Sequence, residues 1–227
     1  MSQSYRSIAF TPSVVDSQVR YGSRAAMQRA DHPVGIPGPD ALTDLERAFV
    51  AEQDHFYLAT TSQSGWPYVQ FRGGPAGFVT SLDEHTLAWA DLRGNRQYIS
   101  VGNLAHDAKV AMIFLDYARQ VRLKVFGLAR VRDVEASEPY VGPLVVPTDR
   151  VIVEREVRIE VQGFDWNCPQ HITPRYTASE LAVSLAPMRS RIHELEAENR
   201  ELERRLAARS SPDGSRTPAP PRPEENP

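Results

Sequence analysis

The sequence predicts a mainly β protein with helices, in which a β-barrel domain is followed by a long coiled-coil helix. Two observations favour the barrel: alternating segments rich in Val, Ile, Phe and Tyr fill residues 56–163, and turn sequences separate them. A third observation is a repeat of apolar residues spaced by three and four after residue 180, which is typical of a coiled coil. We expect four parts, namely a helical N-terminal arm and loop (1–41), the barrel (42–177), a coiled-coil dimerisation helix (178–209) and a disordered proline-rich tail (210–227).

Composition limits the classes of function. A chain of 227 residues with a formal net charge of −3 fits one soluble domain with terminal additions, and it lacks the strongly basic character of nucleic-acid-binding domains. Its single cysteine, Cys168, cannot form a disulfide within the chain, and no apolar run is long enough for a membrane span or a leader near Met1. We therefore expect a cytoplasmic protein that binds neither nucleic acid nor membranes.

The predicted elements follow one another in a simple order. The arm has helical composition interrupted at Gly22, and a Thr-x-x-Glu capping box at Thr43 and Glu46 predicts the start of a helix with a structural role. An inserted helix is expected from about Asn95 to Leu104, after a turn centred on Gly94. The predicted strands cover residues 56–61, 67–72, 77–81, 86–91, 109–116, 121–134 and 150–163.

The insertion carries the best chemical signal. A helix start presents free backbone N–H groups and a partial positive charge, so Arg93 and Arg96 with the amides of Asn95 and Gln97 are typical of a phosphate site. Arg122 alternates with apolar residues on a later strand, as does Lys124, and both are expected to converge on the same cavity. The alternative is that the two arginines of the insertion are solvated surface residues.

A second feature is Gly73 and Gly74 at the end of a predicted strand. They remove side chains where a flat ring can approach the backbone, whereas the alternative for residues 75–77 is a wide turn between strands. The spacing is not G-x-G-x-x-G and no helix follows, so a dinucleotide-binding fold is excluded.

Three blocks together resemble the pyridoxamine 5′-phosphate oxidase superfamily of flavin-binding split β-barrels. They are GWPYVQFRGGPAGF, TLAWADLRGNRQYISVGNLAHDAKVAMIF and RQVRLKVFGLARV, and the similarity covers about residues 45–161. The resemblance implies flavin mononucleotide (FMN) bound at a homodimer interface. It also implies an FMN-dependent oxidoreductase acting on an unidentified small molecule, in a branch separate from the oxidases proper.

The resemblance also implies positions for the cofactor site. Asn95 stands where the family has a basic residue, and Arg122 where the oxidases proper have Gln. The segment GFDWNCPQHITPR resembles the closing segment of one branch, which implies that Trp166 and Asn167 cover the flavin ring from the partner subunit. With the residues argued from the insertion, the expected cofactor-binding set is Gln70, Phe71, Arg72, Gly73, Trp89, Ala90, Asp91, Arg93, Asn95, Arg96, Gln97, Arg122, Trp166 and Asn167.

No residue is predicted to act as an acid, a base or a nucleophile, which suits a reaction carried by a cofactor. Cys168 and His171 are spaced like half of a zinc site, but no second cysteine exists to complete it, so no metal is expected. Two other classes of function stay open at this point. One is a non-enzymatic flavin-binding or haem-binding module, and the other is a deazaflavin-dependent reductase.

The C-terminal repeat has the a/d pattern of a two-stranded coil. Leu195 and Leu202 occupy d positions, and Asn199 occupies an a position between Ile192 and Leu206. An Asn at one a position favours an in-register dimer, because it bonds to its symmetry mate. Pro187 fits the first turn of a helix, so the coil is expected to begin near residue 186. The alternative is an amphipathic helix that packs on its own domain.

Overall fold

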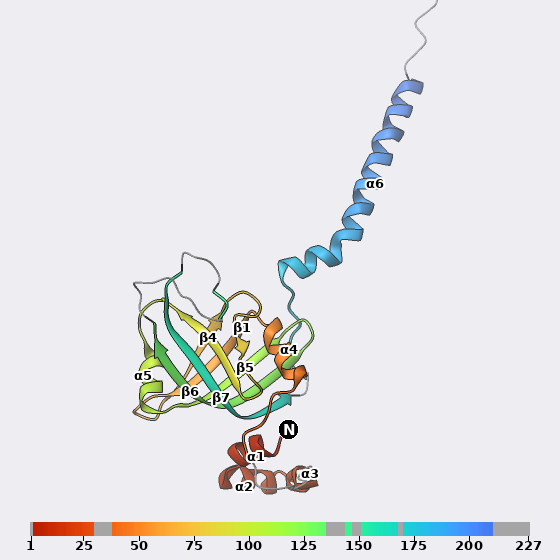
Figure 1. Cartoon of the computed structure of the whole chain (residues 1–227). Helices are drawn as coiled ribbons and strands as arrows, with labels where there is room; N and C mark the ends of the chain where they lie inside the picture. The colour runs from red at the N-terminus through yellow and green to blue at the C-terminus, as the bar shows by residue number, and fades with distance from the viewer. Residues whose placement is uncertain (1, 30–37, 135–143, 147–150, 168–169, 211–227) are drawn as a thin grey trace, which may run out of the picture. The chain divides into compact units, whose positions relative to one another are not determined.

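The computed structural model describes residues 2–29, 38–134, 144–146, 151–167 and 170–210 (Figure 1). It divides into two compact units, Met1–Arg175 and Tyr176–Pro227. Cys168 and the tail from residue 211 lie outside the described residues. Within the described part of the chain, no helix is both long and apolar enough to cross a bilayer.

A seven-stranded antiparallel sheet forms the first unit, in the order β2-β1-β5-β6-β7-β4-β3. The predicted strands are confirmed, with two differences: β3 is only a short bridge, and β7 continues through the segment predicted to follow it. The continuation is possible because β6 pairs with β7 as far as Asn167. The strands are β1 (His55–Thr61), β2 (Pro67–Gly73), β3 (Thr80–Ser81), β4 (Thr86–Leu92), β5 (Lys109–Asp116), β6 (Val121–Asp133) and β7 (Val153–Asn167).

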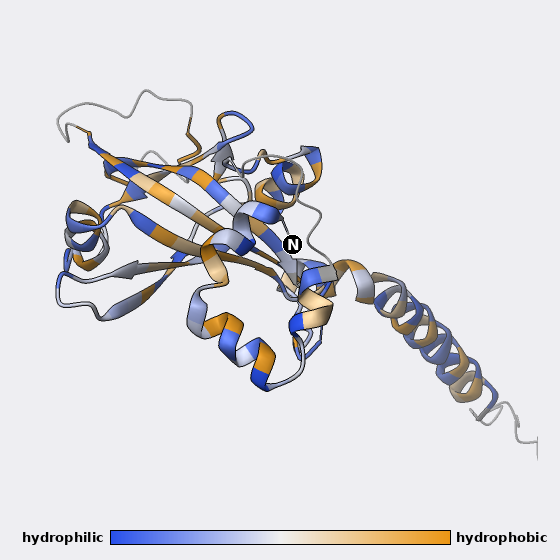
Figure 2. Ribbon diagram, turned by 90° about the horizontal axis from the view of Figure 1, so that it is seen from below, coloured by the Kyte–Doolittle hydropathy of each residue, from blue (hydrophilic) through white to orange (hydrophobic). Residues whose placement is uncertain are grey.

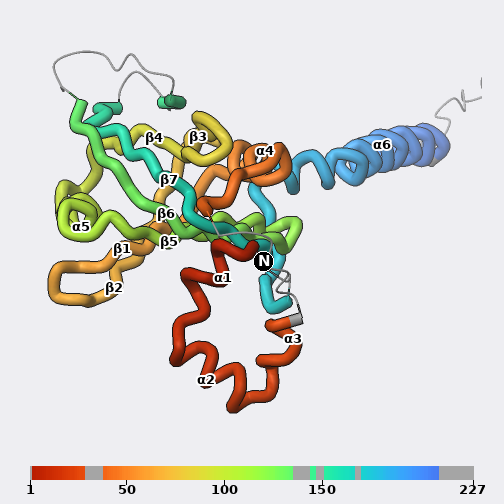
Figure 3. Tube along the Cα trace, turned by 60° about the horizontal axis from the view of Figure 1, so that its bottom comes forward, coloured from red at the N-terminus to blue at the C-terminus, as the bar shows by residue number. Residues whose placement is uncertain are grey.

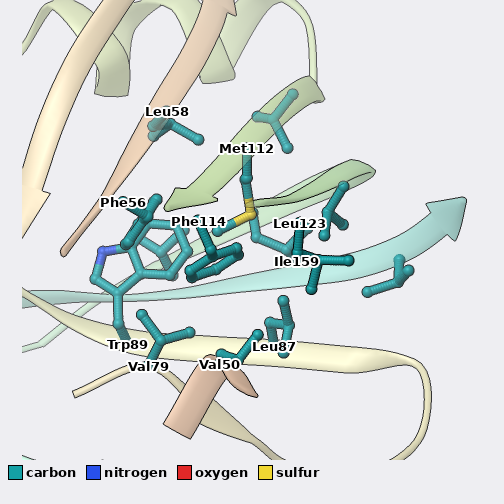
Figure 4. Packing of buried hydrophobic residues seen from close by; sticks show 14 of the residues in the cluster. Val50, Phe56, Leu58, Val79, Leu87, Trp89, Met112, Phe114, Leu123 and Ile159 are labelled. Carbon is teal, nitrogen blue, oxygen red and sulfur yellow. The ribbon is translucent and has the colours of Figure 1, made fainter. Parts of the chain in front are cut away.

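The sheet curls into a split barrel around one apolar core. β1 and β4 are separated by three other strands in the sheet order, yet the rings of Phe56 and Trp89 lie 5.0 Å apart in an edge-on arrangement. Figure 4 shows these two residues facing Phe114 and Ile159 from other strands in the middle of the core. Alternation of buried and exposed residues along the strands supplies this inner face.

Helix α4 (Asp44–Glu52) closes one side of the core. The predicted capping box is confirmed, because the Thr43 side chain accepts from the amide of Leu45 and the Glu46 carboxylate accepts from the amide of Thr43. Glu46 also accepts a 2.6 Å bond from Nε1 of Trp166, whose ring meets Phe49 edge-on. Burial opposes ionisation of Glu46, but the bonds from Thr43 and Trp166 outweigh it and lower its pKa.

The N-terminal arm contains α1 (Gln3–Ala9), α2 (Pro12–Arg20) and α3 (Arg24–Arg29), with the expected break at Gly22. Helix α1 packs closely on the sheet: a Cβ on Gly163 of β7 would lie 2.6 Å from the amide nitrogen of Tyr5. The Tyr5 ring stacks on Phe126 of β6. Figure 3 shows α2 and α3 extending past the sheet.

The inserted helix α5 (Ile99–His106) begins later than the sequence predicts. The predicted start at Asn95 is wrong, because the Asn95 side chain accepts from the amide of Gln97 and forms a turn of its own. Arg96 and Tyr98 adopt left-handed backbone angles, with φ of 59° and 53°. Such angles are costly for residues other than glycine and are concentrated at functional sites.

Candidate functional site

Two adjoining clefts open where β2 and β4, from opposite ends of the sheet, approach each other. We call the first the polar cleft; it has a volume of about 170 Å³, and its lining includes Gln70, Asn95, Arg96 and Gln97. We call the second the aromatic cleft; it has a volume of about 220 Å³ and is lined by residues 71–74, 89–94, Phe78 and Val145. Both clefts share Arg72, Asp91, Leu92 and Gly94.

A buried ion triad joins the two clefts. Asp91 on β4 is almost fully buried, and it accepts a 2.7 Å bond from Arg72 on β2 and a 3.0 Å bond from Arg155 on β7. The pair of Arg72 and Asp91 connects strands that share no backbone hydrogen bonds, so it spans the split of the barrel. Burial disfavours the charge on Arg155, but the bonds from this guanidinium to Asp91 and Glu154 raise its pKa.

Glu154 extends the network on β7. It accepts from Nε of Arg93 at 2.9 Å and from the hydroxyl of Tyr98 at 3.2 Å. The bond from Arg93 has the largest effect on the pKa of Glu154, which it lowers. Burial acts in the opposite direction, and the bond from Arg155 lowers the pKa further. The guanidinium of Arg155 also stacks over the ring of Tyr98 at 5.0 Å. These contacts hold the strained loop before α5 against β7.

Positive charge exceeds negative charge at the clefts. Among the described residues that line them, four arginines (72, 93, 96 and 155) face the two carboxylates of Asp91 and Glu154. Within the described part of the chain, Nε of Arg72 is buried and has no hydrogen-bond partner. A net excess of two positive charges and an unsatisfied guanidinium nitrogen fit a doubly charged anion, such as a phosphate monoester.

The first turn of α5 also lines the polar cleft. Its N-cap, Tyr98, makes no side-chain hydrogen bond to the helix, so no side chain at that position satisfies the first backbone amides. Ser100 in this turn donates to Gln70 on β2, which ties the helix start to the strand. A helix N-terminus beside arginines is a favourable place for an anion.

The aromatic cleft differs from the sequence-based interpretation of its glycines. A Cβ on Gly73 would lie 2.8 Å from the ring of Phe71, and a Cβ on Gly74 would lie 2.6 Å from that of Phe78. The glycines therefore make room for two phenylalanines of the chain itself, and these rings in turn line the cleft. Trp89 is buried beside them, and within the described residues its Nε1 has no hydrogen-bond partner.

The clefts therefore bring together most of the predicted site residues, but not those of β6 and of the end of β7. Arg122 pairs with Asn167 at one end of the β6 and β7 ladder, whereas Asp133 pairs with Arg155 at the other end. Along β6, Arg122 and Asp133 are eleven residues apart, which is about 36 Å of extended strand at about 3.3 Å per residue. Lys124 contacts Asp165 at 2.9 Å instead of entering a cleft. Arg122 and Lys124 therefore line neither cleft of their own chain, and the predicted part of Arg122 in the site stays a prediction.

Trp166 also lies outside the clefts of its own chain, because its indole is held by α4. Its predicted role, like that of Asn167, requires a second subunit and stays a prediction; the Asn167 side chain is outside the described part. Sequence reasoning missed Tyr98, Glu154 and Arg155, because their part in the site depends on β4 pairing with β7. The alternation of charged and apolar residues in β7 was the available signal.

The first unit is a split β-barrel with a cationic cleft where the two edges of its sheet approach each other. The sequence profile of the pyridoxamine 5′-phosphate oxidase family matches residues 42–157, just over half of the chain. The chain therefore belongs to this family, which confirms the resemblance seen in the sequence.

Several solved structures are similar to the chain. A putative pyridoxamine 5′-phosphate oxidase from Lactobacillus delbrueckii is 21% identical, with coverage of 55% of this chain and 93% of that chain and a TM-score of 0.41. HupZ from Group A Streptococcus is 17% identical, with coverage of 60% of this chain and 99% of that chain and a TM-score of 0.41. An FMN-binding protein from Syntrophomonas wolfei is 11% identical, with coverage of 67% of this chain and 96% of that chain and a TM-score of 0.41. A search of the curated proteins finds no match.

Proposed function

We propose that the chain binds FMN in the two clefts and catalyses an FMN-dependent oxidation or reduction of a small molecule. Family membership supports the cofactor. The observation that carries the proposal is the excess of two positive charges over the two clefts together, beside the first turn of α5. Arg72 lines both clefts, and its buried Nε has no hydrogen-bond partner within the described part of the chain. This arrangement suits the phosphate of the mononucleotide.

The residues divide into two roles. Arg72, Arg96 and the first turn of α5 hold the phosphate in the polar cleft, while Phe71 and Trp89 provide the apolar surroundings of the ring in the aromatic cleft. Asp91 keeps the Arg72 guanidinium in place, because it bonds to the opposite edge of that group. FMN, when bound, supplies the hydride chemistry, and the chain supplies orientation and electrostatics.

A second copy of the chain completes this site. Each cleft is smaller than the roughly 300 Å³ at which ligand pockets usually begin. Beside them, the outer face of the sheet carries Phe71, Tyr57 and Ile113 in one row across three strands, with Val69 in the next row. Val69 and Phe71 are 61% and 57% exposed. Exposed apolar faces of this kind are typical of interfaces. The predicted contributions of Arg122, Trp166 and Asn167 then come from the partner.

A titration with FMN and with riboflavin, which lacks the phosphate, tests the assignment. Arg96 is exposed, and among the described residues it bonds to the Tyr98 hydroxyl at 3.4 Å and not to Asp91, so its removal leaves the ion triad intact. We expect Arg96→Ala to weaken FMN binding by about 1–3 kcal/mol and to leave riboflavin binding unchanged. Arg130→Ala is the matched control, because Arg130 is an exposed arginine on β6 outside both clefts. Equal FMN affinity in both variants would contradict the phosphate site.

Turnover separates an enzyme from a binding module. We expect the FMN-loaded protein to be reduced by a nicotinamide coenzyme and reoxidised over repeated cycles when an acceptor is present. A protein that binds FMN tightly but cycles no faster than free FMN is a carrier or a sensor. A protein that ignores FMN and takes up a deazaflavin or haem instead overturns the cofactor assignment.

A further inference from the structure

The flavin site makes no use of α6 (Ala178–Ser210), the helix of the second unit. A capping box starts it, since the Thr177 amide donates to Glu180 and the Glu180 amide donates to the Thr177 hydroxyl. Its stripe residues Leu181, Met188, Ile192, Leu195, Leu202 and Leu206 are 44–63% exposed. Figure 2 shows hydrophobic positions recurring along the helix among hydrophilic ones. An apolar stripe this exposed is typical of a helix that meets another helix.

Asn199 fixes which arrangement of two helices fits this stripe. In the heptad register, Ile192, Asn199 and Leu206 are a residues and Leu195 and Leu202 are d residues. In a parallel, in-register pair Asn199 lies opposite Asn199 of the second copy, where two amides can bond to each other. In an antiparallel pair a residues oppose d residues, so Asn199 faces a leucine such as Leu195 or Leu202, and its amide is desolvated without a partner.

We propose that α6 pairs with α6 of a second copy of this chain as a parallel, in-register, two-stranded coiled coil. The apolar stripe of α6 is thus covered by the apolar stripe of α6 from a second molecule. The inference rests on the dimer of barrels that is part of the proposed function, but not on the cofactor, and it adds a second contact to that dimer.

Flanking charges support the parallel arrangement in one layer and oppose it in another. Across a parallel pair, Arg191 at a g position faces Glu196 at the next e position, which is favourable, while Glu198 faces Glu203, which is not. Within the helix, Glu201 accepts from Arg205 at 2.9 Å and also pairs with Arg204 at 2.9 Å, so the helix is stabilised on its outer face. The charges therefore add little net affinity, and register depends on Asn199.

Pro187 limits the length of the coil. It lies inside α6, and Figure 1 shows the helix bent in its first third. The straight part from Met188 to Leu206 offers fewer than three heptads, about 30 Å of helix at 1.5 Å per residue. A coil this short is marginal by itself, so it forms with the help of the barrel interface, which raises the local concentration of the two helices.

Disulfide trapping in the full-length chain tests the arrangement. In a Cys168→Ser background, Leu202→Cys places a thiol at a d position, and Arg204→Cys places one at an outward f position as the matched control. We expect mild oxidation to cross-link most of the Leu202→Cys chains into dimers and to leave the Arg204→Cys chains monomeric on denaturing gels.

Each other outcome overturns the proposal. Cross-linking only when Leu202→Cys is mixed with Ile192→Cys indicates an antiparallel pair. Similar cross-linking of Leu202→Cys and Arg204→Cys indicates random collision, and no cross-linking indicates that the stripe meets a different surface. None of these outcomes bears on FMN binding, which is measured in the same preparations.

Discussion

At the residue scale, Asp91 is the centre of the ion triad that joins the two clefts. This carboxylate is 3% exposed and accepts hydrogen bonds from Arg72 and Arg155, which come from two other strands. A buried ion pair is weak evidence of net stability, but removing one partner of it leaves uncompensated charge behind. Asp91 therefore joins β2 to β4 and β7, and it orients Arg72 at the proposed anion site.

We expect Asp91→Asn to lower the free energy of unfolding by about 3–5 kcal/mol, because two largely buried guanidinium groups lose their shared counter-charge. Urea denaturation followed by tryptophan fluorescence measures the change. Arg130→Gln, which disrupts only an exposed 3.6 Å pair with Glu160, is the control and should cost less than about 1 kcal/mol. If Asp91→Asn lowered the free energy of unfolding no more than the control does, the triad would not contribute to the stability of the fold.

Glu154 gives a prediction about pH. Its pKa is lowered in the folded chain by Arg93 first and then by Arg155, so the folded state binds fewer protons at this site than the unfolded state. The stabilisation is complete above the ordinary pKa of Glu, about 4.3, and is lost as the pH falls through the lower folded value.

We therefore expect the stability difference between the natural chain and Glu154→Gln to be largest near neutral pH and to shrink toward pH ~3. Urea midpoints across this range measure it. A difference that stays constant over the whole range would mean that Glu154 acts through packing and not through its charge.

At the scale of elements, the strands were predictable and their partners were not. Alternation along β1, β5 and β6 follows from each of these strands having one buried face, which any single segment reveals. The bond between Asp91 and Arg155 joins residues 64 positions apart, and only the pairing of β4 with β7 creates it. For the same reason the sequence pointed to Arg93 and Arg96 but not to the network that joins Arg93 to Glu154 and Asp91 to Arg155.

Local competition explains the other errors. The helix expected at Asn95 begins at Ile99, because a turn made by the Asn95 side chain precedes it. β7 continues past Gly163, since β6 offers a pairing edge and α1 packs over that glycine. The turn at Asn95 is local in the sequence, whereas the contacts of β7 with β6 and α1 come from distant segments and are not visible around β7 itself.

Gly163 gives a prediction for α1. Gly163→Ala places a methyl group within 2.6–2.8 Å of the Tyr5 backbone, so α1 must move away from β7. We expect faster amide hydrogen exchange in α1, while the exchange of β1 and β5 stays slow. Gly102→Ala is the control, because its Cβ would meet nothing within 4 Å in α5, and alanine there should stabilise the helix by about 1 kcal/mol. Unchanged exchange in α1 would contradict the close packing.

At the scale of the whole molecule, we expect dimerisation and cofactor binding to be linked. Val69 lies on the outer face of β2 and lines neither cleft, so Val69→Asp introduces a charge at the proposed interface without touching the site. We expect this variant to sediment as a weaker dimer and to bind FMN less tightly.

The control is Leu45→Asp, at a similarly exposed position (65%) on α4. This variant should keep both the dimer and the FMN affinity of the natural chain. Loss of the dimer in the Val69 variant without any change in FMN affinity would show that one barrel suffices for the site.

The proposal that the chain binds FMN is tested by the visible absorbance spectrum of the purified protein, recorded before and after addition of FMN. Mass analysis of any small molecule released on denaturation identifies what was bound. We expect the spectrum of a bound oxidised flavin, with the mononucleotide as the released molecule. A colourless protein that ignores FMN, or one that releases a different cofactor, would contradict the account.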